Sequence, residues 1–109
     1  MIDLTTLFPY TFDKKYSKPV AYFSMEFAID QPLKIYSGGL GFLAGSHMRS
    51  AYELKQNMIG IGILWKKGYY DQERNQDQTL KATFRDKDYS FLTDVGITFP
   101  ITIHGARVY

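Results

Sequence analysis

Residues 36–41 read Tyr36-Ser37-Gly38-Gly39-Leu40-Gly41, which places three glycines within four positions. Glycine has no Cβ atom, so this run predicts a turn whose backbone passes where side chains would obstruct it. From Leu40 onward, apolar residues recur at spacings of four and three, as on one face of an α-helix. They are Leu40, Ala44, Met48, Ala51 and Leu54. The sequence therefore predicts a helix that begins directly at the glycine loop.

Short apolar segments flank this loop and helix. Residues 20–23 follow a proline and are rich in β-branched and aromatic side chains, which favours a buried strand. In residues 58–64, isoleucines occupy one face and Gly60 and Gly62 the other, as expected of a second strand. The glycine face would let a backbone or a ligand approach closely. The order strand, loop, helix, strand is typical of the right-handed parallel crossover unit of an α/β sheet.

The second half of the chain has a different pattern. Two partly apolar strips flank the polar run Glu73-Arg74-Asn75-Gln76-Asp77-Gln78, which predicts a β-hairpin excursion with a solvated tip. Alternation resumes at residue 99, and residues 107–109 are expected to continue the same strand. The inward-facing residues of that strand are expected to be Phe99, Ile101 and Ile103.

The length of 109 residues suits one small domain with one core. The composition, 45% hydrophobic and 17% aromatic, excludes a disordered chain. We divide the chain into a leading arm, residues 1–19, which contains Leu4, Leu7 and Phe8, a strand–loop–helix–strand unit, residues 20–64, and a hairpin with following strands, residues 65–109. The expected fold class is α/β.

Charge and cysteine content exclude several kinds of function. The net charge is only +2, from 13 basic and 11 acidic residues, so neither nucleic acid nor an anionic membrane is an expected partner. The absence of cysteine excludes disulfides, thiolate metal sites and a cysteine nucleophile. The first residues are not those of a secretory signal, and the apolar run of residues 58–65 is too short to span a bilayer. We expect a cytoplasmic protein.

The glycine loop is the strongest chemical feature of the sequence. A helix N-terminus presents unpaired N–H groups and the positive end of the helix dipole, and glycines let the backbone itself contact an anion. Gly38, Gly39 and Gly41 are therefore candidate phosphate ligands, with a purely structural turn as the alternative. A dinucleotide site is disfavoured, because Trp65-Lys66-Lys67 stands where an acidic residue would bind the ribose.

Three other polar residues, Glu26 and the two histidines, could carry chemistry. Glu26 follows the first strand, where active-site carboxylates of α/β sheets often lie, but it could instead hydrogen-bond the glycine loop. His47 lies on the predicted helix away from its apolar stripe, and His104 is expected to be exposed. Two isolated histidines give no metal site.

Five groups of residues carry a resemblance to a known family: Val20-Ala21-Tyr22-Phe23-Ser24-Met25-Glu26-Phe27, Ile35 to Gly41, Leu43-Ala44-Gly45 with His47 and Ser50-Ala51, Ile59-Gly60-Ile61-Gly62, and Gly68-Tyr69-Tyr70. Together they resemble the N-terminal part of the α-glucan phosphorylases, which include the glycogen, starch and maltodextrin enzymes. The resemblance covers nearly the whole chain and is firmest over residues 20–72. The chain differs from shorter bacterial members at Ser46, where they have Asp, and from animal members at Ala28, where they have Tyr.

The resemblance implies a partial Rossmann-like domain, the N-terminal domain of a GT-B glycosyltransferase. In that family inorganic phosphate cleaves the terminal α-1,4 linkage of a glucan and releases glucose 1-phosphate. The resemblance also implies pyridoxal phosphate, held by a lysine beyond residue 109; no metal is expected, because the two histidines are isolated. It assigns phosphate and glucose contacts to the loop residues Gly38, Gly39, Leu40 and Gly41, and supporting roles to Glu26 and His47.

On this interpretation the chain is an N-terminal fragment with no complete catalytic set, and it is expected to be inactive alone. A glycogen or starch synthase is the second interpretation. Synthases carry Lys two residues before the first glycine, whereas this chain has Tyr36. A stand-alone module that binds anions or glucans is the third. An incomplete sheet also has an unpaired edge and an uncovered face, so self-association is expected.

Overall fold

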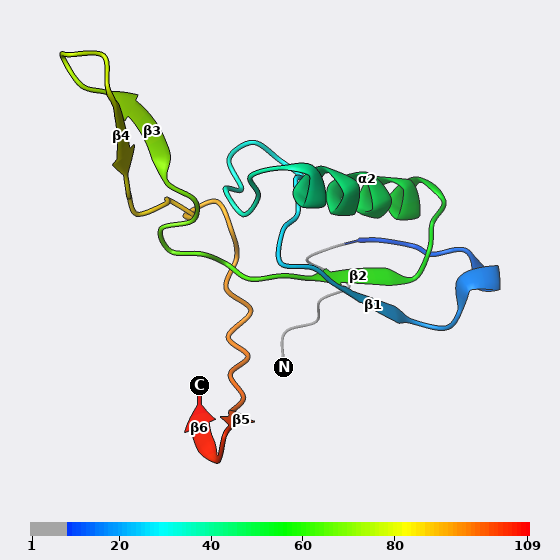
Figure 1. Cartoon of the computed structure of the whole chain (residues 1–109). Coiled ribbons are helices and arrows are strands. Elements are labelled where there is room, and N and C mark those ends of the chain that lie inside the picture. The colour runs from blue at the N-terminus through cyan, green and yellow to red at the C-terminus, as the bar shows by residue number, and fades with distance from the viewer. Residues whose placement is uncertain (1–8) are drawn as a thin grey trace.

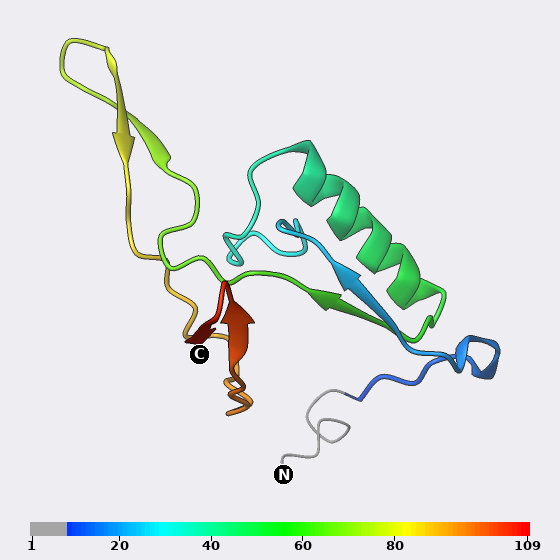
Figure 2. The same cartoon turned by 60° about the horizontal axis from the view of Figure 1, so that its bottom comes forward.

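The centre of the molecule is formed by strand β1 (Val20–Phe23), helix α2 (Gly39–Glu53) and strand β2 (Met58–Ile61). The structure, a computed structural model, describes residues 9–109. β1 and β2 pair in parallel, with Val20 opposite Met58 and Phe23 opposite Ile61. Helix α2 connects them and lies along one side of the pair (Figures 1 and 2). The predicted parallel strand–helix–strand unit is confirmed, although β2 is shorter than residues 58–64.

The core lies between α2 and the glycine face of β2. A Cβ atom on Gly60 would lie 3.2 Å from the Met48 methyl group, and one on Gly62 would lie 3.1 Å from the Phe27 ring. Groups do approach this face closely, but they are side chains rather than the backbone or ligand that the sequence predicted. Phe27, Ile35 and Ala44 form the buried cluster. The helical stripe is buried at Ala44 and Ala51 but exposed at both ends.

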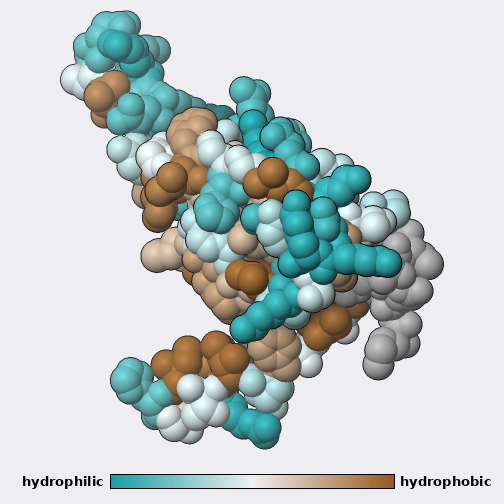
Figure 3. Space-filling model, turned by 90° about the vertical axis from the view of Figure 1, so that its right-hand side faces the viewer, coloured by the Kyte–Doolittle hydropathy of each residue, from teal (hydrophilic) through white to brown (hydrophobic). Residues whose placement is uncertain are grey.

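Strands β3 (Asp71–Arg74) and β4 (Leu80–Thr83) form the predicted hairpin excursion. The turn between them is closed by the Asn75 amide, which donates to the Thr79 carbonyl at 2.9 Å. At the base of the hairpin the Lys87 ammonium group lies 3.1 Å from the Asp71 carboxylate. The hairpin extends away from α2, and its tip is hydrophilic (Figures 1 and 3).

The prediction of one continuous last strand is wrong. β5 (Ile101–Ile103) and β6 (Ala106–Val108) are separate strands that pair antiparallel with each other. His104 and Gly105 reverse the chain with φ angles of 46° and 82°. Positive φ at both central residues is typical of the tightest hairpin turns, so the His-Gly pair was the signal for a turn.

The inward orientation predicted for this strand is also wrong. Phe99, Ile101 and Ile103 are 68%, 50% and 48% exposed. β5 pairs with β6 alone, away from the central sheet, so a two-stranded ribbon has no second layer to cover these side chains. The C-terminal hairpin is the lower lobe in Figure 3, which shows apolar surface on it.

Replacing Gly105 by alanine should open the C-terminal hairpin. A Cβ atom at positive φ costs about 1 kcal/mol, which is large for a pair of three-residue strands. We expect cross-strand nuclear Overhauser effects between Thr102 and Arg107 to weaken strongly in Gly105→Ala. The matched variant, His104→Gly, relieves positive φ at the neighbouring residue and should strengthen them. Unchanged signals in Gly105→Ala would contradict this account of the turn.

The described part of the leading arm packs on the C-terminal end of α2. The short 3-10 helix η1 (Lys14–Tyr16) follows Asp13, whose amide donates to the Lys55 carbonyl at 2.8 Å. The Tyr10 hydroxyl donates to the Gln56 carbonyl at 2.8 Å, and its ring stacks on Tyr52. Leu4, Leu7 and Phe8 lie outside the described residues.

The molecule is elongated, because its two hairpins project from the centre. Its radius of gyration is 17.6 Å and its extents are 59 × 37 × 28 Å, whereas a compact domain of this length has a radius of about 13 Å. Over residues 9–109 the fold is mixed α/β, with one α-helix and three two-stranded sheets, one of them parallel. Within that range no helix is long and apolar enough to cross a membrane.

Candidate functional site

The glycine loop leaves the first turn of α2 open on its outer side. Gly38 is the N-cap residue, and no side chain caps the helix. Cβ atoms added to Gly38 or Gly39 would meet nothing within 4 Å. The first N–H groups of an α-helix have no partner within the helix, and the first turn carries no acidic residue. A small anion could therefore approach the backbone here without meeting a side chain of the loop.

Gly41 and Gly45 serve a different purpose from Gly38 and Gly39. A Cβ atom on Gly41 would lie 2.5 Å from the Tyr36 Cβ and 3.0 Å from the Glu26 carboxylate. A Cβ atom on Gly45 would lie 2.2 Å from the carbonyl oxygen of Ala28. Both glycines are buried. They let α2 pack directly against the segment that follows β1, so the loop combines open and close-packed glycines.

Glu26 lies buried beneath the glycine loop, with 7% of its surface exposed. Its carboxylate accepts hydrogen bonds from the Ser37 amide at 3.2 Å, from the Ser37 hydroxyl at 3.3 Å and from the Tyr69 hydroxyl. The hydrogen bond from Tyr69, followed by those from the amides of Ser37 and Gly38, holds the pKa of Glu26 below its ordinary value. The structure thus shows the predicted hydrogen bonding of Glu26 to the glycine loop.

Tyr69 was missed as a site residue by reasoning from the sequence. It lies in the segment between β2 and β3, far from Glu26 in the sequence, and its hydrogen bond to the carboxylate raises the pKa of Tyr69. The adjacent Gly68 adopts φ +61°, and a Cβ atom there would lie 3.0 Å from the Lys34 carbonyl oxygen. The sequence feature that could have indicated Tyr69 is the Gly68-Tyr69-Tyr70 motif. Its glycine permits the turn that brings Tyr69 to the glycine loop.

The remaining sequence-predicted residues lie elsewhere. The His47 side chain on α2 is exposed, and its ring lies 4.9 Å from the ring of Tyr22 on β1. Leu40 is 52% exposed at the helix start. His104 is exposed, as expected, but in the hairpin turn rather than in a strand. Within residues 9–109 no group of three His, Cys, Asp or Glu side chains is placed to hold a metal ion.

Known proteins with similar sequences are much longer than this chain. An uncharacterized protein of Methanocaldococcus jannaschii is 53% identical over 92 residues, which are 84% of this chain and 18% of that protein. The maltodextrin phosphorylase of Thermococcus litoralis is 49% identical over 63 residues, 58% of this chain and 8% of that enzyme. The glycogen phosphorylase of Mycobacterium tuberculosis is 41% identical over 69 residues, 63% of this chain and 8% of that enzyme. A region of about three fifths of this chain is homologous to a segment of the α-glucan phosphorylases.

The resemblance expected from the sequence is thereby confirmed in part, because it was expected over nearly the whole chain. The similarity to the two named phosphorylases covers about three fifths of this chain and less than a tenth of either enzyme. No family profile and no solved structure matches the chain.

Proposed function

We propose that this chain supplies the phosphate- and glucose-facing loop of an α-glucan phosphorylase, as part of the Rossmann-like N-terminal domain of a GT-B fold. The reaction is the attack of inorganic phosphate on the terminal α-1,4 linkage of a glucan, which releases glucose 1-phosphate. The observation that carries this proposal is the geometry of the glycine loop, open above Gly38 and Gly39 and held from below by Glu26.

The charges around the loop suit an anionic ligand. The N-terminal end of a helix carries about half a positive charge, on the N–H groups of its first turn. The negative charge of Glu26 is met by donors of Ser37, Gly38 and Tyr69. The amides of Gly39, Leu40 and Gly41 belong to the first turn of the helix. We propose that these amides contact phosphate and the departing glucose, with Glu26 fixing the loop and His47 in a supporting position.

The cofactor of the phosphorylases does not fit the described residues. An amine that forms an imine has to be neutral and inside a pocket. Eight of the nine lysines are exposed. The ninth, Lys87, is half-buried but lies 3.1 Å from the Asp71 carboxylate, where it is an ion-paired ammonium group. Pyridoxal phosphate would therefore be held by the part of the parent enzyme beyond this chain, and the chain alone is expected to be inactive.

Tyr36 favours a phosphorylase over a glycogen or starch synthase. A synthase would place a lysine at this position to bind the sugar nucleotide. In the structure the Tyr36 ring packs on Phe42 with ring centres 5.6 Å apart. Tyr36 therefore acts as a packing residue at the loop and offers no positive charge to a nucleotide.

A segment exchange tests the proposed function. The matching segment of the Thermococcus litoralis maltodextrin phosphorylase is replaced by that of this chain, and glucose 1-phosphate release from maltodextrin is measured. Because the glycine loop would do the same work in both proteins, we expect activity within about tenfold of the parent enzyme. The isolated chain should release none. A folded but inactive chimera would contradict the proposal, and activity of the isolated chain would contradict the fragment interpretation.

Gly39→Val in the chimera tests the loop itself. The side chain would fill space that is open in the structure, and it should raise the KM for phosphate by about tenfold or more by blocking the amides. Ala82→Val, in the distant hairpin, is the matched control and should leave this KM unchanged. An unchanged KM in Gly39→Val would remove the loop from the phosphate site.

A further inference from the structure

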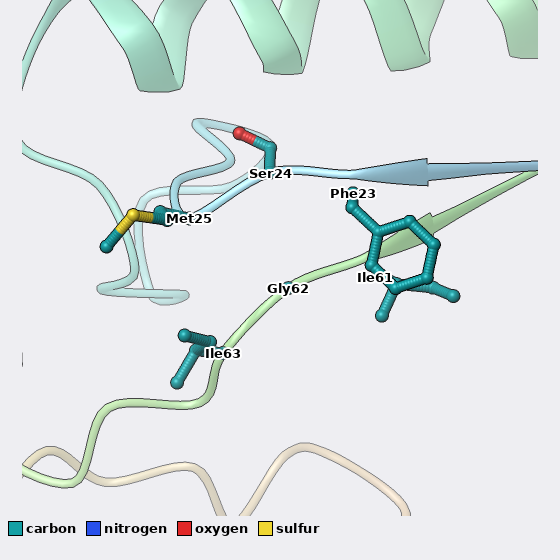
Figure 4. A pocket seen from close by; sticks show the side chains of 6 residues that line it. All are labelled: Phe23, Ser24, Met25, Ile61, Gly62 and Ile63. Carbon is teal, nitrogen blue, oxygen red and sulfur yellow. The ribbon is translucent and has the colours of Figure 1, made fainter. Parts of the chain in front are cut away.

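The turn after β1 directs Glu26 toward the glycine loop. Figure 4 shows Ser24 pointing toward α2 and Phe23 pointing away from it. The Ser24 hydroxyl donates to the Glu26 carbonyl at 2.8 Å and accepts from the Glu26 amide at 3.3 Å. The Ser24 amide donates to the Ile61 carbonyl at 3.1 Å, which ties this turn to β2. The sheet therefore fixes the backbone of Glu26, but other contacts have to fix the carboxylate at the end of its side chain.

The two oxygen atoms of the Glu26 carboxylate have different partners. Oε2 accepts from the Ser37 amide at 3.2 Å, and a Cβ atom on Gly41 would lie 3.0 Å from it. Oε1 accepts from the hydroxyls of Ser37, at 3.3 Å, and Tyr69. Ser37 directly precedes Gly38, the N-cap residue of α2. Of these donors, only Tyr69 comes from outside the glycine loop.

The segment that carries Tyr69 is itself held in place. Gly68 turns the chain with φ +61°, and a Cβ atom there would lie 3.0 Å from the Lys34 carbonyl oxygen. The Tyr89 hydroxyl donates to the Trp65 carbonyl at 2.9 Å. These contacts fix the backbone on the N-terminal side of Tyr69. A donor held by a separate segment can fix the carboxylate relative to the sheet, whereas donors of the loop would move with the loop.

The hydroxyl group of Tyr69, rather than its ring, makes the contact that matters for the loop. Tyr69 is 42% exposed, whereas the carboxylate that it reaches belongs to a residue that is only 7% exposed. Among the interactions that lower the pKa of Glu26, the hydrogen bond from Tyr69 is the largest. A hydrogen bond to an ionised group is about twice as strong as one between neutral groups. Phenylalanine at this position would keep the ring and lose this contact.

We propose that Tyr69 is a positioning residue for the phosphate- and glucose-facing loop, an inference that rests on the proposed function. Tyr69 holds the Glu26 carboxylate, the carboxylate holds the Ser37 amide, and Ser37 sets where the first turn of α2 begins. Tyr69 acts through Glu26 and does not itself contact phosphate or glucose. The orientation of the loop amides therefore depends on a residue of the segment between β2 and β3.

The phosphorylase chimera, built with residues 20–89 of this chain, tests the proposal by its kinetics. Tyr69→Phe should raise the KM for phosphate about fivefold, because the loop amides are then less well positioned. Tyr70→Phe removes the same hydroxyl one residue along, where the ring centre lies 6.2 Å from that of Phe84. This control should change the KM less than about twofold.

The outcomes separate this proposal from the proposed function. Equal effects of Tyr69→Phe and Tyr70→Phe in an active chimera would overturn the role of Tyr69 and leave the proposed function standing. A folded but inactive chimera would contradict the proposed function, and this proposal would fall with it.

A double-mutant cycle in the chimera shows whether Tyr69 acts through Glu26. Glu26→Ala should itself raise the KM for phosphate, because it removes the support of the loop. Adding Tyr69→Phe to Glu26→Ala should raise it less than about twofold further, because two residues that act through one contact are not additive. A role of Tyr69 in the fold alone would multiply the two effects, and that result would overturn the proposal.

Titration of this chain gives a readout that does not depend on activity. The carboxyl carbon shift of Glu26, measured by nuclear magnetic resonance, reports its ionisation. Tyr69→Phe removes the hydrogen bond that most favours the charged form, so the pKa of Glu26 should rise. Tyr70→Phe should leave this pKa where it is in the wild type. An unchanged pKa in Tyr69→Phe would overturn the proposal.

A fluorinated tyrosine at position 69 keeps the proposal testable should Tyr69→Phe fail to fold. It retains the ring and the hydroxyl, and fluorine makes the hydroxyl a stronger donor. The pKa of Glu26 should therefore fall below its wild-type value, which is opposite to the effect of phenylalanine. A pKa that stays the same or rises would overturn the proposal.

Discussion

Replacing Gly45 by alanine is expected to lower the free energy of unfolding by about 2 kcal/mol. The added Cβ atom would lie 2.2 Å from the Ala28 carbonyl oxygen and 2.8 Å from its carbon, well inside van der Waals contact. These are backbone atoms, so the clash cannot be relieved by a rotamer change, and α2 has to move away from the segment after β1. Overpacking of this kind costs about 1–3 kcal/mol, and it outweighs the gain of at most about 1 kcal/mol from the helix propensity of alanine.

Gly39→Ala is the matched control for Gly45→Ala. It introduces the same methyl group into the same helix, but at a position where nothing lies within 4 Å. Its free energy of unfolding should be unchanged or slightly higher, because alanine is the better helix former. Urea unfolding of both variants and the wild type measures the difference. Equal stabilities of the two variants would show that α2 does not pack against Ala28 as described.

Removing the carboxylate of Glu26 is expected to have the second largest effect. Glu26→Ala leaves the donors of Ser37 and Tyr69 without their acceptor beneath the loop, and unmade hydrogen bonds to a charged group cost about 2 kcal/mol. We also expect faster hydrogen exchange at the amides of Ser37 and Gly38, measured by nuclear magnetic resonance. Exchange at these amides that matches the wild type would contradict the role of Glu26 as the support of the loop.

The Glu26 interaction also predicts how stability changes with pH. The folded state holds the pKa of Glu26 below its ordinary value of 4.5, so the unfolded chain takes up this proton first as the pH falls. The stabilisation is therefore complete well above pH 4.5 and is lost as the pH falls through the lowered pKa of the folded state. Glu26→Gln should flatten this acid limb of the stability curve. Glu53→Gln, which changes an exposed glutamate on α2, should leave it in place.

The local elements of the fold could be predicted because their signals are local. The glycine run, the spacing of apolar residues after it and the alternation from residue 58 are each contained in one short segment. They led to α2, to β2 and to its parallel partner. The polar run between two apolar strips likewise predicted the β3–β4 hairpin.

The Glu26–Tyr69 hydrogen bond could not be predicted, because it joins residues far apart in the sequence. No spacing rule indicates which tyrosine reaches a carboxylate. The orientation of Phe99, Ile101 and Ile103 was wrong for a related reason. Alternation shows that two faces differ, but whether a second layer covers one of them depends on the position of the strand in space. The pair His104-Gly105 was a local turn signal that the continuous alternation of apolar residues masked.

The parallel pairing of β1 and β2 also sets the order in which the chain can fold. Hairpins such as β3–β4 and β5–β6 join neighbours in sequence and close within about 1–10 μs. β1 and β2 are separated by the whole of α2, so their pairing has to overcome a larger loop-closure entropy. We therefore expect the docking of β2 beside β1 to be slower than the closure of either hairpin. Until β2 docks, we expect both hairpins to be only marginally stable, because two-stranded hairpins need a packed neighbour.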